Sequence, residues 1–159
     1  MEIQYLQKLI EYPAGLDAYG NLSFENEPSS MEEILEMEAL YNNGNQFPKV
    51  LRELLYLAGE GCYCLSYNAV DPDNIISTQT YMQQSVRSYD VPNTPLSSST
   101  RPFYIIDTAY LGDFRFVYLD EGDDPIVHHI DEKDGSISTF GQTLSQLIEH
   151  VIRHTHKLF

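Results

Sequence analysis

Two adjacent histidines, His128 and His129, stand in the stretch DPIVHHIDEKDGSIS, closely followed by acidic residues and a glycine. Imidazoles beside carboxylates could hold a metal ion or exchange protons with a substrate. Adjacent residues of a strand point to opposite faces, so the two rings cannot easily share one metal. The acids of DEKDG also lack the alternate spacing of a calcium loop. Asp-Gly between two strand-like runs instead predicts a β-hairpin, with one histidine in the core and the other toward solvent.

A second pair, His150 and His154, is four residues apart near the end of the chain and shares a face if the segment is helical. A metalloprotease helix needs a glutamate directly after its first histidine, and Val151 stands there. Histidines at the C-terminal end of a helix are also stabilised by the helix dipole, and the sequence favours this interpretation. A metal-dependent hydrolase using the pair is the less favoured alternative.

Other catalytic patterns are incomplete. GLDAYGNL has the glycine spacing of a phosphate loop, but Asn21 and Leu22 replace the required Lys and Ser/Thr. There is no G-x-S-x-G nucleophile elbow, and no two carboxylates stand out as an acid/base pair. Cys62 and Cys64 are awkward to bridge and are expected to be two buried small residues. We therefore expect a protein that is not an enzyme, with no catalytic residue, no cofactor and no metal.

The charge of the chain points to its partners. There are 24 acidic residues against 9 Lys plus Arg, which gives a formal net charge of -15. Such a surface repels nucleic acid, and it favours solubility and steered encounter with basic proteins. The N-terminal stretch lacks the pattern of a signal peptide, and no apolar run approaches the length of a membrane span. With two unpaired cysteines, these features predict a cytoplasmic protein.

The elements that must position these residues follow from apolar periodicity and turn signals. Helices are expected over residues 3–12, from a capping box at Ser30 and Glu33 to NNGN, over FPKVLRELLYLAGEG, over 75–89 and within TFGQTLSQLIEHVIRHTHKLF. Strands are expected in CYCLSYNAV, FYIIDTA, YLGDFRFVYL and PIVHHI. Helices flanking hairpin-linked strands predict a single α+β domain over residues 1–159, with a central, mostly antiparallel sheet.

Four of these segments resemble the SUKH superfamily, namely FPKVLRELLYLAGEG, FYIIDTAYLGDFRFVYLD, DPIVHHIDEKDG and STFGQTLSQLIEHVIRH. The resemblance covers roughly residues 31 to 154, and the chain lacks the tryptophans that many members carry. It implies an α+β fold with helices around a central sheet and no shared catalytic residues. Many bacterial members are immunity proteins that neutralise a cognate toxin, often a nuclease, and fungal relatives regulate cell-wall synthesis.

The resemblance and the charge together predict a protein that binds a basic toxin through an acidic surface. The alternative is a regulatory scaffold for cell-wall or signalling proteins. An acidic loop is most often only solvated, but beside a sheet it can be a recognition patch. The residues expected to meet the partner are Asp120, Glu121, Asp123 and Asp124 in LDEGDDP, then Asp71 and Asp73 in DPDN, with Tyr67 and Tyr110 as aromatic anchors.

Overall fold

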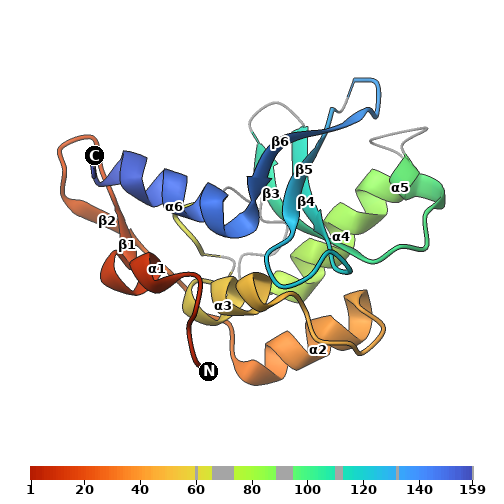
Figure 1. Cartoon of the computed structure of the whole chain (residues 1–159), viewed down its shortest axis with the longest axis horizontal. Helices are drawn as coiled ribbons and strands as arrows, with labels where there is room; N and C mark the ends of the chain where they lie inside the picture. Colours follow the sequence, from red (N-terminus) through yellow and green to blue (C-terminus); the bar gives the residue numbers. More distant parts are fainter. Residues whose placement is uncertain (60, 66–73, 89–94, 110–112, 132, 159) are drawn as a thin grey trace.

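The computed structural model describes residues 1–59, 61–65, 74–88, 95–109, 113–131 and 133–158 (Figure 1). Its helices are α1 (Gln7–Glu11), α2 (Met31–Tyr41), α3 (Lys49–Leu57), α4 (Ile75–Ser88), α5 (Pro95–Ser98) and α6 (Leu144–Thr155). Its strands are β1 (Ala14–Leu16), β2 (Leu22–Glu25), β3 (Phe103–Ala109), β4 (Asp113–Tyr118), β5 (Ile126–Ile130) and β6 (Ile137–Thr143). The α+β class is confirmed.

The main sheet has the strand order β3-β4-β5-β6, and each neighbouring pair is antiparallel. Strands β1 and β2 form a separate antiparallel pair. The predicted hairpin after His129 is the connection between β5 and β6. In Figure 1 the main sheet stands between α6 and α3 on one side and α4 with α5 on the other. Helices cover both faces of the sheet, so the side chains that point to each face are expected to be mainly apolar.

The stretch FYIIDTA shows this directly. Tyr104 and Ile106 lie in the larger core with α2, α3 and α6, whereas Phe103 and Ile105 lie in a smaller core with α4. All four side chains are at most 1% exposed. Alternate residues of a strand point to opposite faces, so one continuous apolar run supplies both cores.

The capping box predicted at the start of α2 is present. The Ser30 hydroxyl accepts the N–H of Glu33 at 3.2 Å, and the Glu33 carboxylate accepts the N–H of Ser30 at 2.7 Å. The helix buries Ile34 and Met37 as expected and ends before Gly44, whose φ is 80°. A positive φ at this point suits glycine because it has no Cβ.

The first helix is shorter than the expected residues 3–12. It buries Leu9 and packs the preceding Leu6, while Ile10 is 50% exposed. The reason lies in α3, where the buried Glu53 carboxylate accepts the N–H groups of residues 4, 5 and 6 at 2.7, 2.9 and 3.0 Å. These donors are held outside the helix, which therefore starts at Gln7.

The strand predicted for CYCLSYNAV is also wrong where the structure describes it. Residues 62–65 form a turn, in which the N–H of Leu65 donates to the Cys62 carbonyl at 3.2 Å. The rest of that segment lies outside the described residues. Cys62 and Cys64 are buried free thiols, as predicted. An apolar run this short cannot be distinguished from a buried turn by periodicity alone.

The β1–β2 hairpin was not predicted from the sequence, and the signal for it is local. One carboxylate oxygen of Asp17 accepts the N–H groups of Tyr19 and Asn21 at 2.8 and 2.9 Å, and Gly20 has a φ of 84°. These contacts make DAYGN a side-chain-supported turn between two short strands. The short helix α5 was likewise not among the helices expected from the sequence.

Candidate functional site

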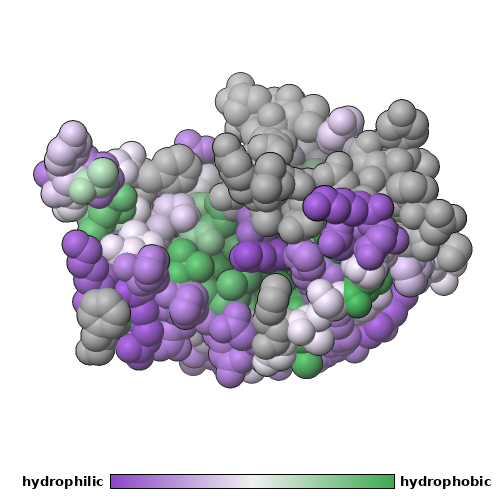
Figure 2. Space-filling model, turned by 90° about the horizontal axis from the view of Figure 1, so that it is seen from above, coloured by the Kyte–Doolittle hydropathy of each residue, from purple (hydrophilic) through white to green (hydrophobic). Residues whose placement is uncertain are grey.

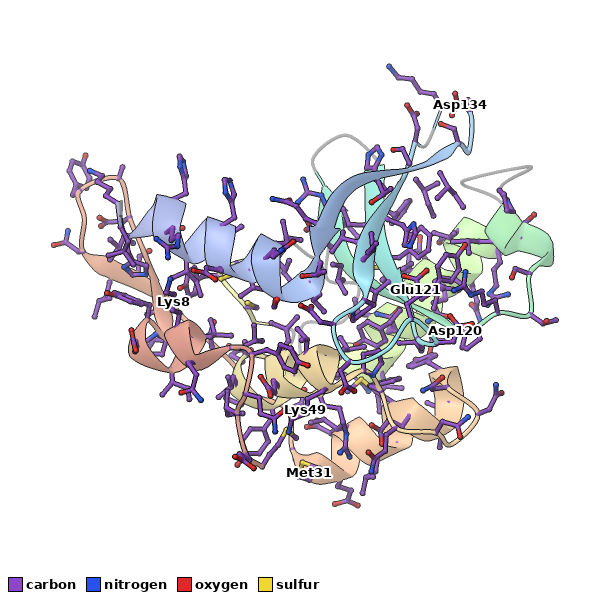
Figure 3. All side chains as sticks on the ribbon, in the orientation of Figure 1. Lys8, Met31, Lys49, Asp120, Glu121 and Asp134 are labelled. Atoms are coloured by element: carbon purple, nitrogen blue, oxygen red, sulfur yellow. The ribbon has the colours of Figure 1, made fainter. Side chains whose placement is uncertain are left out.

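The acidic loop of residues 119–125 joins β4 to β5. Its Gly122 has a φ of 85°, a conformation that side chains rarely adopt. The carbonyl of Asp123 accepts the N–H of Val50 at 3.0 Å, and the carbonyl of Pro125 accepts the N–H of Leu144 at 2.9 Å. The loop is therefore docked by its backbone against the first turns of α3 and α6. Figure 3 shows Asp120 and Glu121 together at the end of the sheet nearest α2 and α3.

Asp120 forms a bidentate ion pair with Arg101. The guanidinium Nε lies 2.9 Å from both carboxylate oxygens, and Nη2 lies 2.6 Å from Oδ1. The same guanidinium lies over the Tyr118 ring, 3.7 Å from its centroid. The hydrogen bonds from Arg101 lower the pKa of Asp120, and Asp120 in turn raises the pKa of Arg101. Both groups are therefore held in their charged forms.

Glu121 connects this ion pair to the sheet. It accepts from Arg101 Nη2 at 3.2 Å, and both of its carboxylate oxygens lie 3.3 Å from His128 Nε2. The His128 ring stacks on Phe116 at 5.3 Å between centroids and meets Tyr118 edge-on at 4.9 Å. His128 therefore packs on the aromatic residues of β4, and its Nε2 lies beside the Glu121 carboxylate.

The two adjacent histidines diverge across the strand, as predicted. His128 pairs with Phe116 on the face of the smaller core, while His129 is the cross-strand partner of Arg115, and its Nδ1 lies 3.4 Å from the Ser138 hydroxyl. Both are half-buried, so the expectation of one core and one solvent-facing histidine is wrong.

The last two acids of the loop differ from each other. Asp124 accepts the backbone N–H of Ser145 at 3.0 Å and the Ser145 hydroxyl at 2.6 Å, at the first turn of α6. A carboxylate in that position compensates the positive end of the helix dipole. Asp123 is exposed, and among the described residues its carboxylate makes no hydrogen bond or ion pair. The loop thus brings all four predicted acids together but leaves only Asp123 uncommitted.

The other four residues expected to contact a partner, Asp71, Asp73, Tyr67 and Tyr110, lie outside the described residues.

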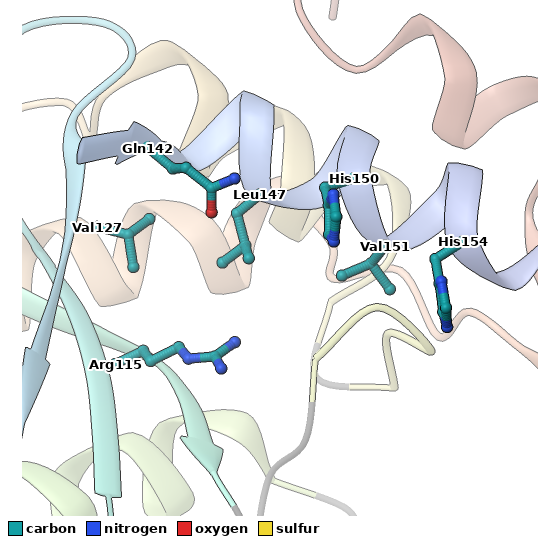
Figure 4. Close-up of a pocket in the computed structure, with 7 residues that line it drawn as sticks. All are labelled: Arg115, Val127, Gln142, Leu147, His150, Val151 and His154. Carbon is teal, nitrogen blue, oxygen red and sulfur yellow. The ribbon is translucent and has the colours of Figure 1, made fainter. Parts of the chain in front are cut away.

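His150 and His154 lie on one face of α6, as their spacing predicts, and both line a cavity of about 350 Å³ between α6 and the sheet. Figure 4 shows the two rings pointing the same way and the Arg115 guanidinium directed into the same space. Val127, Leu147 and Val151 supply the apolar part of the wall. On the face seen in Figure 2, apolar surface likewise lies in the middle with hydrophilic side chains around it.

Arg115 is the residue of this cavity that the sequence did not single out. Its Nη1 lies 3.3 Å from the carboxylate of Asp107 on the neighbouring strand, and Asp107 is 6% exposed. The alternation in DFRFVY places Arg115 on the face opposite to its phenylalanines, which is the signal that could have found it. Within the ranges that the structure describes, no group of three or more His, Cys, Asp or Glu side chains is arranged to hold a metal ion.

Comparison of the chain with protein-family models, with curated proteins and with solved structures finds no match. Among the described residues, no helix has both the length and the apolar character needed to cross a bilayer.

Proposed function

We propose that this chain is a non-enzymatic, cytoplasmic binding protein that neutralises a basic toxin of the nuclease type. The observation that carries the proposal is the acidic loop of residues 119–125, fixed in place on a chain with a net charge of -15. The resemblance of residues 31–154 to the SUKH superfamily supports a toxin as the partner. The mechanism is electrostatic steering followed by steric cover of the toxin's phosphate-binding surface.

The distribution of cations supports an acidic outer surface. Among the described residues, six of the nine Lys and Arg side chains lie within ion-pair distance of a described carboxylate, namely Lys8, Lys49, Arg52, Arg101, Arg115 and Arg153. The chain has many more acids than these pairs use, so most carboxylates have no cation of the protein to neutralise them. Such an excess speeds association with a basic protein and makes it sensitive to salt.

The fixed loop supports binding in a second way. Arg101, His128, Val50 and Ser145 hold it at separate points. A loop that is already ordered loses little conformational freedom on binding, so more of the contact energy is retained as affinity. The exposed Asp123 at its tip can contact a Lys or Arg of the partner without breaking an internal contact.

The proposal is tested by co-expression with candidate toxins encoded beside it, with growth rescue as the measurement. For a toxin from which the protein rescues growth, Asp123→Lys is expected to weaken binding about tenfold at low salt, mainly through slower association. Glu36→Lys, an exposed acid on α2, is the matched control because it changes the net charge equally. Equal losses in the two variants would assign binding to overall charge and not to the loop. If co-expression of the protein rescues growth from none of the candidate toxins, the proposed function is refuted.

A further inference from the structure

A larger cavity lies at the end of the molecule opposite the acidic loop. In Figure 1 the β1–β2 pair, α1 and the C-terminal end of α6 meet there. The cavity has a volume of about 560 Å³, and its apolar wall includes Tyr12, Leu22 and Leu57. Leu22 is 73% exposed at its edge. A cavity of this size is within the range of binding pockets for ligands and for large side chains.

Two side chains of this cavity carry buried nitrogens without a partner. Asn26 Nδ2 and His156 Nε2 have no solvent contact and no hydrogen bond to a described residue. Asn26 is fixed at two points. Its side-chain Oδ1 accepts the backbone N–H of Tyr63 at 3.4 Å, and its backbone N–H donates to the Pro13 carbonyl at 3.3 Å. A buried polar group without a partner is costly, so natural proteins rarely keep one without a reason.

The His156 ring is held as firmly as Asn26. It packs on Tyr12 with 4.7 Å between ring centroids and meets Tyr63 edge-on at 5.9 Å. The Tyr63 hydroxyl donates to the Tyr12 carbonyl at 2.8 Å, which ties these two aromatic residues together. Neither unpartnered nitrogen can therefore reach a new protein group by a simple side-chain rotation. Both nitrogens are closed to a water-sized atom, so a bound molecule that offers a carbonyl and an N–H satisfies them only when the side chains around them shift on binding.

The edge of the cavity is acidic. Glu11 and Glu25 line it and are exposed, and neither carboxylate forms a hydrogen bond or ion pair with another described residue. They would attract a cationic side chain beside whatever enters the cavity. A peptide segment combines these three properties: an apolar side chain, a backbone with a carbonyl and an N–H, and a neighbouring Lys or Arg.

We infer that this cavity binds an apolar side chain flanked by Lys or Arg in an exposed segment of the protein partner. The inference rests on the proposed function, since the same basic partner would also meet the acidic loop. Ser145, which holds Asp124, and His156 lie at opposite ends of α6, about 17 Å apart along the helix at 1.5 Å per residue. One interface of standard size can span that separation.

The direct test uses the purified protein and the peptide acetyl-Lys-Leu-Lys-amide, followed by NMR of the Asn26 side-chain amide and the His156 ring. Saturable shifts of both groups are expected. Acetyl-Lys-Ser-Lys-amide and acetyl-Glu-Leu-Glu-amide should bind at least about tenfold more weakly, since each lacks one of the two recognised features. Absence of shifts at these groups, or equal affinity for the three peptides, would overturn the inference.

The matched variants are Leu22→Lys at the edge of the cavity and Leu40→Lys on α2, where Leu40 is 56% exposed and does not line the cavity. Leu22→Lys should lower affinity for acetyl-Lys-Leu-Lys-amide at least about tenfold, and Leu40→Lys should not change it. If Leu22→Lys unfolds, the double variant Glu11→Gln with Glu25→Gln should remove the preference for the basic peptide over acetyl-Gln-Leu-Gln-amide. A retained preference would exclude the acidic edge from recognition.

These measurements separate the cavity from the function. Peptide binding at Asn26 and His156 without rescue from any toxin leaves the cavity established and refutes the proposed function. If Leu22→Lys does not affect growth rescue and no peptide binds, the proposed function stands and the inference that the cavity is a binding site is refuted.

Discussion

The side-chain amide of Gln79 on α4 bonds both backbone groups of Ile105 on β3. Its Nε2 donates to the Ile105 carbonyl at 2.9 Å, and its Oε1 accepts the Ile105 N–H at 3.0 Å. Gln83, one turn later, donates to the Phe103 carbonyl at 3.0 Å. Strand β3 comes first in the order β3-β4-β5-β6 that the described residues form. The two glutamine side chains therefore fix α4 to the backbone of this strand.

Gln79→Leu is expected to destabilise the protein by about 1 to 3 kcal/mol, because it removes two buried hydrogen bonds to the backbone of Ile105. Gln79 is 1% exposed, so water cannot easily replace the amide. The measurement is urea unfolding. Ser77→Leu, at an exposed position of α4, is the control. A change below about 0.5 kcal/mol, the size of an ordinary surface substitution, would show that these hydrogen bonds do not hold α4 on the sheet.

Glu53→Gln is expected to loosen the N-terminal segment. The Glu53 carboxylate is fully buried and accepts the N–H groups of residues 4, 5 and 6. An amide keeps one acceptor oxygen and points N–H groups at the remaining donors, which costs about 1 to 3 kcal/mol. Unfolding measurements should show this loss, and hydrogen exchange should become faster at residues 4–6. Glu36→Gln on the exposed face of α2 should change neither, and slow exchange retained in Glu53→Gln would contradict the role assigned to this carboxylate.

These two contacts show where sequence reasoning stops. The helices α2, α3, α4 and α6 and the strands β3, β4 and β5 could be predicted, because their apolar periodicity and capping residues are local. Gln79 and Glu53 act on backbone groups 26 or more residues away, and nothing in their own neighbourhoods marks them. A buried glutamine or glutamate looks the same as an exposed one in a sequence. Long-range polar contacts of this kind therefore had to come from the structure.

The candidate site could likewise be predicted from the sequence only in part. The acidic loop stands out in LDEGDDP, and its four acids do lie together. Their separate roles depend on partners distant in the chain, such as Arg101 for Asp120 and Ser145 for Asp124. The cavity beside Asn26 and His156 was missed because its wall combines residues from the two ends of the chain. Only the folded chain brings those residues together.

The Arg101–Asp120 pair predicts a specific dependence on pH. The folded state lowers the pKa of Asp120 below its ordinary value of 3.8. A carboxylate with a lowered pKa stabilises the fold above the ordinary pKa, and that contribution is lost as pH falls through the folded pKa. The side chain of Asp120 is 49% exposed, so the contribution is screened and should be about 1 kcal/mol or less.

Arg101→Gln should therefore return the pKa of Asp120 toward 3.8, as followed by NMR titration of its carboxyl carbon. It should also reduce the loss of stability as the pH falls below about 4, since the pKa of Asp120 then no longer differs between the folded and unfolded states. Arg153→Gln, which removes an exposed pair with Glu149, leaves the titration of Asp120 unchanged as the control. A titration of Asp120 that is identical with and without Arg101 would disprove the assigned cause.

Asp123 and Asp124 should separate binding from stability. Asp124 accepts two hydrogen bonds at the first turn of α6, so Asp124→Leu is expected to cost about 1 to 2 kcal/mol of stability, as loss of a helix cap does. Asp123→Leu should change stability by less than about 0.5 kcal/mol, because its carboxylate is exposed and makes no hydrogen bond or ion pair with a described residue. Thermal and urea unfolding of the two variants give these values. Charge reversal at both positions together would mix the two effects, so only the single change at Asp123 reports on partner binding. Equal stability losses in the two variants would mean that Asp123 also supports the fold and that its exposure is no sign of a binding role.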